Sequence, residues 1–298
     1  MSHQPGHAAA HDHDHDHAPG DPAHEAALTE LLDLDGEVLA DYLADVTAWI
    51  AATAQPPVSR IVDLGAGTGT GTFALLRAFP GARVTAVDLD PGRLHRLRER
   101  AGRLGLDDRV DVAAIDLDRP WPELRSLIGG PADLTWASMS MHHLGDPDQA
   151  LARILALLRP GGSLAVAETS SDDSFPRFLP GDGALEDRVH AALTARHAEQ
   201  VPELGSDWTT RLTAAGFTIT AERQFAIALE APLPPATGRY AQLTLDRLRT
   251  GLADQLDPAD QQALAALVAD HGPASVRHRD DLTVRATRLL WLARRPPR

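Results

Sequence analysis

The sequence predicts an α/β fold in which helices cover both faces of a parallel sheet. Between residues 60 and 168, short apolar runs of strand length alternate with segments whose apolar residues recur every three or four positions. Strands that alternate with helices in this way imply a parallel sheet with right-handed crossovers. The first apolar run breaks into a glycine-rich turn, and acidic residues lie near the ends of the first three runs.

Each element has its own signal. Strands are predicted at residues 60–64, 83–88, 109–115, 132–138 and 163–168, with two late strand-like runs at 217–229 and 282–293. Helices are predicted at residues 73–79, 148–158, 183–199, 207–216, 240–252 and 258–271. A further helix begins at Asp90-Pro91, and Leu94, Leu97 and Leu104 are expected on its buried face. Residues 169–180 are polar and read as a loop.

The chain is expected to divide into three parts. Residues 1–24 form a disordered tail rich in His and Asp, which carries half of the 14 histidines. Loose, incidental binding of a divalent metal is the alternative for this tail, since nothing in it fixes a coordination geometry. Residues 25–55 form a helical cap, with Gly36 between two helices and Gln55-Pro-Pro57 at its end. Residues 56–298 form the main domain, with insertions at about 170–205 and 232–281.

Composition excludes several classes of protein. The chain has 298 residues and a formal net charge of −14, which argues against non-specific binding to nucleic acid. It has no cysteine, so disulfides, thiolate metal sites and cysteine nucleophiles are excluded. No apolar run approaches the ~20 residues of a membrane span, and no hydrophobic signal core is present. A cytoplasmic protein without membrane or nucleic-acid partners is expected.

The glycine-rich turn contains Gly65, Gly67, Gly69 and Gly71. The dinucleotide pattern G-x-G-x-x-G fails, because threonine occupies its last position in either register. The phosphate-binding P-loop pattern fails because no lysine follows. What is present is Asp63-Leu-Gly-Ala-Gly-Thr-Gly69, which resembles the first motif of the class I S-adenosylmethionine-dependent methyltransferases of the small-molecule type.

The resemblance continues through residues 133–144 and through the "L-R-P-G-G" turn within residues 157–168. It covers residues 58–168 well, and the ends only in general layout. It implies a Rossmann-like, doubly wound sheet of seven strands, mostly parallel, with an antiparallel last strand between the fifth and sixth. It also implies that the N-terminal helices cap the cofactor and close the acceptor pocket.

The cofactor expected from the resemblance is S-adenosylmethionine, which leaves as S-adenosylhomocysteine. Independently, Asp88 lies 23 residues after Gly65, the spacing at which such a sheet places an acid on ribose hydroxyls. The resemblance places Asp63 near the amino group of the cofactor, and Asp116 near the adenine. The expected cofactor-binding residues are Asp63, Gly65, Ala66, Gly67, Thr68, Gly69, Asp88, Leu89, Asp116, Leu117 and Ser138.

Methyl transfer is an in-line displacement at a sulfonium carbon, in which the enzyme mainly aligns the nucleophile. A base helps if the acceptor must lose a proton, and His142 and His143 are the candidate catalytic residues, with a purely structural role as the alternative. His190, His197 and Glu199 are further candidates on the acceptor side. Glu168, Asp172 and Asp173 attract a cationic acceptor or are solvated turn residues.

The predicted function is methyl transfer to an O, N or C atom of a small molecule. A protein or RNA methyltransferase and a non-catalytic cofactor-binding scaffold are the alternatives. The net negative charge argues against RNA as the substrate, and the absence of the dinucleotide glycine pattern argues against an NAD-dependent oxidoreductase. The helices before Gln55 and after Pro235 are candidates for a homodimer contact.

Overall fold

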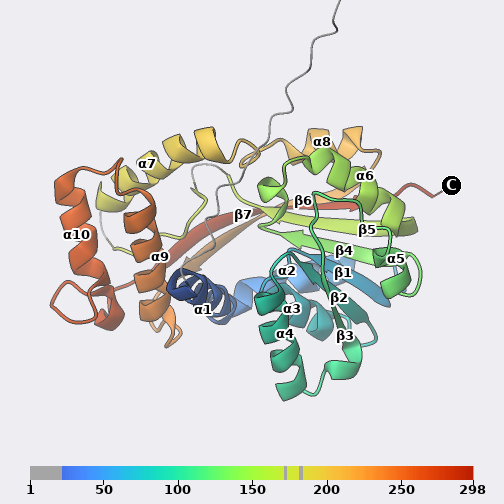
Figure 1. The fold of residues 1–298 in the computed structure, drawn as a ribbon, viewed down its shortest axis with the longest axis horizontal. Helices are drawn as coiled ribbons and strands as arrows, with labels where there is room; N and C mark the ends of the chain where they lie inside the picture. Colours follow the sequence, from blue (N-terminus) through green and yellow to red (C-terminus); the bar gives the residue numbers. More distant parts are fainter. Residues whose placement is uncertain (1–21, 171–172, 181–183, 298) are drawn as a thin grey trace, which may run out of the picture.

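The computed structural model describes residues 22–170, 173–180 and 184–297, which form a sheet lobe and a helical lobe (Figure 1). The sheet has seven strands in the order β3-β2-β1-β4-β5-β7-β6. Their bounds are β1 Arg60–Leu64, β2 Arg83–Asp88, β3 Val110–Ala114, β4 Ala132–Ser138, β5 Leu158–Glu168, β6 Thr218–Leu229 and β7 Val284–Arg294. Strands β1 to β5 pair in parallel, and β7 is antiparallel to both β5 and β6. The predicted fold class is confirmed.

Helices pack on both faces of the sheet, as its nearly continuous apolar strands require. Helices α2 (Ala40–Thr53), α3 (Thr70–Ala78) and α4 (Pro91–Arg103) cover one face, and α5 (Leu124–Leu127), α6 (Pro147–Leu157) and α8 (Trp208–Ala214) cover the other (Figure 1). Each face has its own hydrophobic core. In β1, Ile61 packs into the core beneath α2, α3 and α4, whereas Val62 and Leu64 pack into the core beneath α5, α6 and α8. This alternation follows from the two-residue period of a strand.

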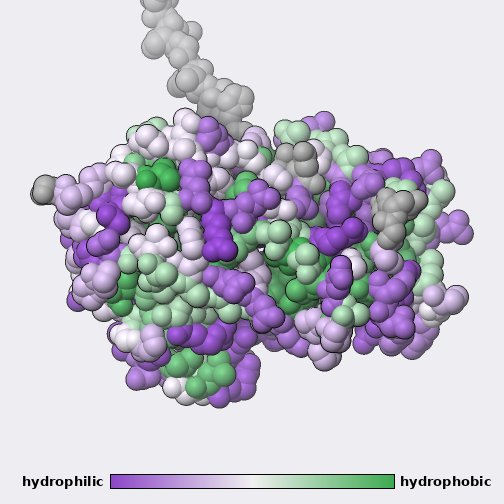
Figure 2. All heavy atoms as spheres, turned by 180° about the vertical axis from the view of Figure 1, so that it is seen from behind, coloured by the Kyte–Doolittle hydropathy of each residue, from purple (hydrophilic) through white to green (hydrophobic). Residues whose placement is uncertain are grey.

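A third core holds the helical lobe together. Helices α1 (Pro22–Val38), α7 (Ala184–Gln200), α9 (Thr237–Gly251) and α10 (Pro258–Val268) gather around the ends of β6 and β7 that run past the other strands (Figure 1). Buried Leu31, Val189, Tyr240 and Leu264 supply one residue from each helix to this core. Figure 2 shows hydrophobic residues in the depression where the two lobes meet. None of the described helices is long and apolar enough to cross a membrane.

Three sequence predictions about the ends of helices are wrong. The break between the first two helices falls at Leu39, and Gly36 lies inside α1. A Cβ atom on Gly36 would lie 2.3 Å from Thr70 Cγ2, so this glycine allows close contact between α1 and α3. Leu104 is 53% exposed because α4 ends at Arg103, before the helical register reaches it. Helix α1 begins at Pro22, inside the predicted tail, and residues 1–21 lie outside the described residues.

The predicted fifth strand also begins earlier than expected, because the "L-R-P-G-G" turn is part of it. Leu158 pairs with Ala132, and regular pairing resumes at Ser163 with Leu134. Gly162 is required in this irregular stretch, since a Cβ atom there would lie 2.9 Å from the Arg159 carbonyl oxygen.

A buried carboxylate ties this stretch to the start of the central strands. Asp133 accepts hydrogen bonds from the Ser59 backbone N–H, the Ser59 hydroxyl and the Arg60 N–H, each at 2.9 Å. Arg159 Nε donates to its other oxygen at 2.6 Å. Burial raises the pKa of Asp133, but the hydrogen bonds from Ser59, Arg159 and Arg60 outweigh it and hold the pKa below its usual value. The carboxylate is therefore charged in the folded protein near neutral pH.

We expect Asp133→Ala to lower the free energy of unfolding at pH 7 by about 2–4 kcal/mol, because it leaves buried donors and one guanidinium without their acceptor. Urea unfolding measures the change. The folded pKa is depressed, so this stabilisation is present above the unfolded pKa of about 3.9 and disappears as pH falls through the folded value.

Asp111→Ala is the matched control, since its carboxylate forms an exposed pair with Arg83 and little change is expected. A loss below about 1 kcal/mol for Asp133→Ala would contradict the role of this carboxylate as a clamp.

Candidate functional site

A cavity of about 410 Å³ opens at the carboxyl ends of β1, β2 and β4. The glycine turn after β1, the end of β2 and the segment after β4 form its walls, together with side chains from α1, α4 and α9. Ligands of open α/β sheets bind beyond the carboxyl ends of the strands. The position of the cavity therefore marks it as the candidate site.

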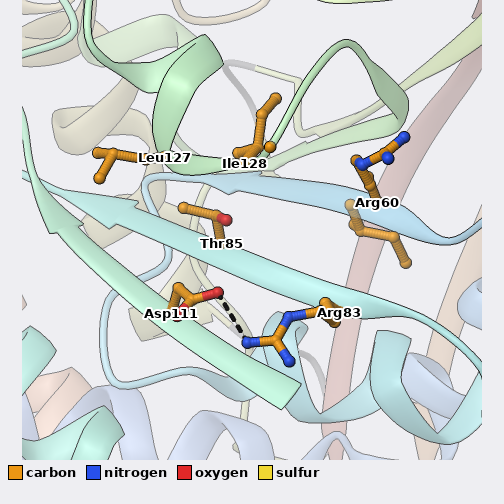
Figure 3. A pocket seen from close by; sticks show the side chains of 8 residues that line it. Arg60, Arg83, Thr85, Asp111, Leu127 and Ile128 are labelled. Carbon is orange, nitrogen blue, oxygen red and sulfur yellow. Dashed lines mark hydrogen bonds and ion pairs between the residues drawn. The ribbon is translucent and has the colours of Figure 1, made fainter. Parts of the chain in front are cut away.

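A second hollow of about 470 Å³ lies at the opposite end of the sheet (Figure 3). Arg60 and Arg83 begin β1 and β2 there, and Arg83 Nη2 lies 3.3 Å from Asp111 Oδ2 in an exposed ion pair. Although slightly larger, this hollow is at the amino ends of the strands and includes neither the glycine turn nor any predicted site residue. We do not assign a ligand to it.

The glycine turn presents backbone to the cavity. Gly65, Gly67 and Gly69 have φ values of +72°, +55° and +91°, which residues with a Cβ atom rarely adopt. The N–H groups of Gly65 and Ala66 both donate to the Val87 carbonyl, at 2.8 and 2.9 Å. A Cβ atom on Gly65 would lie 2.4 Å from Ser140 Cβ. The turn is thus fastened to β2 on one side and touches the segment after β4 on the other.

Asp88 ends β2 directly beneath the turn. It is 7% exposed, and its Oδ2 accepts from the Gly67 N–H at 2.8 Å while its Oδ1 accepts from the Asp90 N–H at 3.0 Å. These two bonds fix the carboxylate in the cavity wall. Because a carboxylate has about four acceptor positions, it can still receive hydrogen bonds from the hydroxyls of a ligand.

Asp63 is the most deeply buried acid of the site, at 2% exposure. Thr72 Oγ1 donates to its Oδ2 at 2.6 Å. Burial raises the pKa of Asp63 to about 7, with a further contribution from the Asp88 charge, although the Thr72 hydrogen bond opposes both. The carboxyl group is therefore about half protonated at neutral pH, and its proton responds to any charge that enters the cavity.

All the predicted cofactor-binding residues line this cavity except Gly69. Gly69 caps α3 instead, and a Cβ atom there would lie 2.6 Å from Leu97 Cγ. At the far end, Asp116 accepts from the Asp118 N–H at 2.9 Å. Leu89 is 68% exposed, so its side chain lies at the rim of the cavity.

The two candidate histidines differ in their surroundings. His142 is 7% exposed, its Nδ1 hydrogen-bonds Glu168 Oε2, and it does not line the cavity. Glu168 Oε1 also accepts from the Met141 N–H at 3.0 Å, so this acid stabilises the segment that follows β4. His143 does line the cavity, with its ring 4.1 Å from that of His142 between centroids. His143 is exposed at the cavity, and partial desolvation, followed by the nearby positive groups, lowers its pKa below the usual value.

The sequence predicted that the N-terminal helices cover the cavity, but it did not identify the individual residues that the helices bring to it. These are Leu28, Leu32 and Asp35 from α1, Leu43 from α2, Arg93 from α4 and Arg247 from α9. The three leucines belong to the helical spacing that predicted the cap at residues 25–55, and Arg93 follows Asp88 by five positions. Asp35 and Arg247 have no sequence signal of their own. The predicted acceptor-side residues His190, His197 and Glu199 do not line this cavity, and Asp172 lies outside the described residues.

Among the described residues, no group of three or more His, Asp or Glu is placed to hold a metal ion.

Comparisons with known proteins agree with this geometry. Residues 62–164 match a family model described as a methyltransferase domain. Trans-aconitate 2-methyltransferase of Methylobacterium nodulans is 30% identical over 235 residues, which cover 78% of this chain and 81% of that protein. The uncharacterized protein syc1184_c of Synechococcus is 36% identical over 107 residues, which cover 36% of this chain and 24% of that protein. The YcgJ protein of Bacillus subtilis shares the fold with a TM-score of 0.51 at 14% identity, covering 87% of this chain and 100% of that chain.

The fold and the site define an α/β protein with a cofactor cavity at the carboxyl ends of its strands. With the similarity to the Methylobacterium nodulans enzyme over most of both chains, they show that the chain belongs to the class I S-adenosylmethionine-dependent methyltransferases. The chain spans only 8% to 24% of three longer curated relatives that it also matches.

The cofactor of this family is S-adenosylmethionine, and the residues present suit it. Gly65 and Gly67 present backbone without side chains to the cavity, and Asp88 offers a fixed carboxylate beside them. Acidic side chains Asp63, Asp88, Asp116 and Asp118 line the cavity, and they complement a ligand that carries positive charge.

We expect binding of S-adenosylhomocysteine to release protons at pH 7. The ammonium group of the ligand favours the charged form of Asp63, whose pKa of about 7 then falls, and up to about half a proton leaves. Calorimetric titration in two buffers of different ionisation enthalpy measures this release as a difference between the two binding enthalpies.

Asp63→Asn is expected to abolish the difference between the buffers, whereas Asp111→Ala, which removes a carboxylate at the other end of the sheet, keeps it. Equal binding enthalpies for the wild-type protein in both buffers would show that Asp63 does not titrate with the ligand.

Proposed function

We propose that this protein transfers the methyl group of S-adenosylmethionine to an O, N or C nucleophile of a small molecule. The observation that carries the proposal is the continuity of one cavity from the glycine turn and Asp88 to His143 and Arg247. One half is suited to the cofactor, and the other leaves space for an acceptor. The relative of comparable length, trans-aconitate 2-methyltransferase, is named for a small-molecule acceptor and supports that class here.

In this proposal the residues around the glycine turn hold the cofactor. The backbone of Gly65, Ala66 and Gly67 lies along its methionine part, and Asp63 accepts from its amino group. Asp88 accepts from the ribose hydroxyls, which is a strong, charge-assisted contact. Asp116 and Leu117 bound the adenine at the end of the cavity.

When bound, S-adenosylmethionine supplies an electrophilic methyl group on a sulfonium. The chain then has to align the nucleophile and exclude water, which accounts for much of the rate of such a displacement. Ser140 and His143, in the segment after β4, face the space where the acceptor enters. The burial of the neighbouring His142 and Glu168 keeps this segment fixed.

His143 is neutral at neutral pH in this environment, so it can accept a hydrogen bond or a proton from the acceptor. Its low pKa makes it a weak base. We therefore assign it mainly to orienting the acceptor, with proton removal confined to acceptors that are themselves acidic. His142 is assigned a positioning role through its contact with the His143 ring.

The experiment that tests this function combines cofactor binding with transfer. We expect Asp88→Ala to weaken S-adenosylhomocysteine binding by about 1.5–3 kcal/mol, or roughly tenfold to 150-fold, because a charge-assisted contact is lost. Calorimetry measures the affinity, and incubation with methyl-labelled S-adenosylmethionine and a panel of small molecules detects transfer.

Asp111→Ala is again the control, since its carboxylate lies outside the site. If the wild-type protein binds neither S-adenosylmethionine nor S-adenosylhomocysteine, the proposal fails. Tight binding of the cofactor without transfer to any member of a broad panel would instead support the non-catalytic scaffold.

A further inference from the structure

We infer that the acceptor carries an oxyanion, a carboxylate or a phosphate, and that Arg247 on α9 binds it. This inference rests on the proposed function, because it concerns the acceptor half of the same cavity. It adds the chemical class of the substrate and one specificity-determining residue that no sequence motif indicated.

Arg247 lines the cavity, and no carboxylate or carbonyl of a described residue pairs with its guanidinium. The other arginines of the same helix behave differently. Arg239 Nε donates to Glu30 at 2.7 Å, and Arg249 Nη2 donates to Asp246 at 2.8 Å. The helix thus has counter-ions for the arginines that stabilise the fold and none for the one that faces the cavity.

An aromatic ring holds Arg247 without using its donors. Its Cζ atom lies 5.5 Å from the centroid of the Phe175 ring, within the range of a cation–π contact. The Phe175 ring in turn stacks on His197 of α7, with centroids 6.5 Å apart and an interplanar angle of 29°. A guanidinium held by such a contact keeps its N–H groups available, and these match the two oxygens of a carboxylate or phosphate.

The titratable groups around Arg247 supply no negative charge to pair with it. Its neighbours His143 and His197 are bases. Arg93 of α4 also lines the cavity, but its guanidinium already has acidic partners, since it lies 3.2 Å from Asp90 and 3.6 Å from Glu25. Arg247 is exposed, and its positive charge contributes to the lowered pKa values of both histidines. An anion beside Arg247 would supply the counter-charge that no described residue provides, and it would favour the protonated form of either histidine.

The acids of the cavity are engaged elsewhere. Asp63 and Asp88 lie at the glycine turn, and Asp116 and Asp118 hydrogen-bond backbone N–H groups near the adenine end. Asp35 of α1 accepts from the Tyr240 hydroxyl at 2.6 Å. The cavity is therefore divided into an acidic half, suited to the cationic cofactor, and a half whose free charge is positive.

The test uses protein saturated with S-adenosylhomocysteine and matched pairs of probes. Glutarate, benzoate and phenyl phosphate are titrated by calorimetry against the neutral glutaramide, benzamide and phenol. We expect at least one anion to bind, with its neutral partner at least tenfold weaker. Comparison of benzoate with phenyl phosphate distinguishes a carboxylate from a phosphate as the preferred group.

Arg247→Gln is expected to weaken binding of that anion by roughly tenfold to 100-fold, the loss typical of one charge-assisted contact, and Arg247→Lys is expected to retain part of it. Arg249→Gln, two residues further along the helix and paired with Asp246, is the matched control and leaves the affinity unchanged. Equal affinity of anions and neutral probes, no binding of any anion, or an unchanged affinity in Arg247→Gln would each overturn the inference.

A parallel titration of S-adenosylhomocysteine into Arg247→Gln separates this inference from the proposed function. Unchanged affinity for S-adenosylhomocysteine is expected. A tenfold loss would mean that Arg247 binds the carboxylate of the cofactor, which overturns the inference and leaves the proposed function intact. If the wild-type protein fails to bind S-adenosylhomocysteine at all, the proposed function itself has failed.

Discussion

The rest of the site depends on the attachment of the glycine turn to β2. Two successive N–H groups, of Gly65 and Ala66, share the Val87 carbonyl, and the next residue of β2, Asp88, accepts from Gly67. This bond pattern brings backbone rather than side chains to the cavity, because only glycine tolerates the required φ values. It also places Asp88 within reach of a ligand and starts α3 in the right direction.

The sequence was informative where one physical requirement selects few residue types. Buried parallel strands must be apolar throughout, so the strands were predicted within a few residues, and Asp88 was predicted from its spacing. Gly36 was misread as a break between helices, because in sequence a glycine that permits close contact between helices looks the same as one that ends a helix. Arg247 could not be predicted, since only the packing of the α9 insertion against α1 and α10 gives an ordinary surface-type arginine its place at the cavity.

The environment of the cavity acts in opposite directions on the pKa values of the acid and the base that share it. It raises the pKa of Asp63 and lowers the pKa of His143, so both groups tend toward their neutral forms near pH 7. The cavity consequently presents little fixed charge at these two positions until a ligand arrives. A cation near Asp63 and an anion near Arg247 would each restore charge locally, which favours joint occupation by ligands of opposite sign.

The long β6–β7 pair has an evolutionary consequence. Its ladder extends from Thr218 opposite Arg294 to Leu229 opposite Val284, so the segment between the two strands leaves and re-enters the sheet at neighbouring points. Segments whose ends lie close together tolerate replacement or lengthening without disturbing their host. Because this segment contains α9, descendants of the protein could acquire new acceptors by exchanging one insertion, while the part of the cavity built by the glycine turn and β2 stayed unchanged.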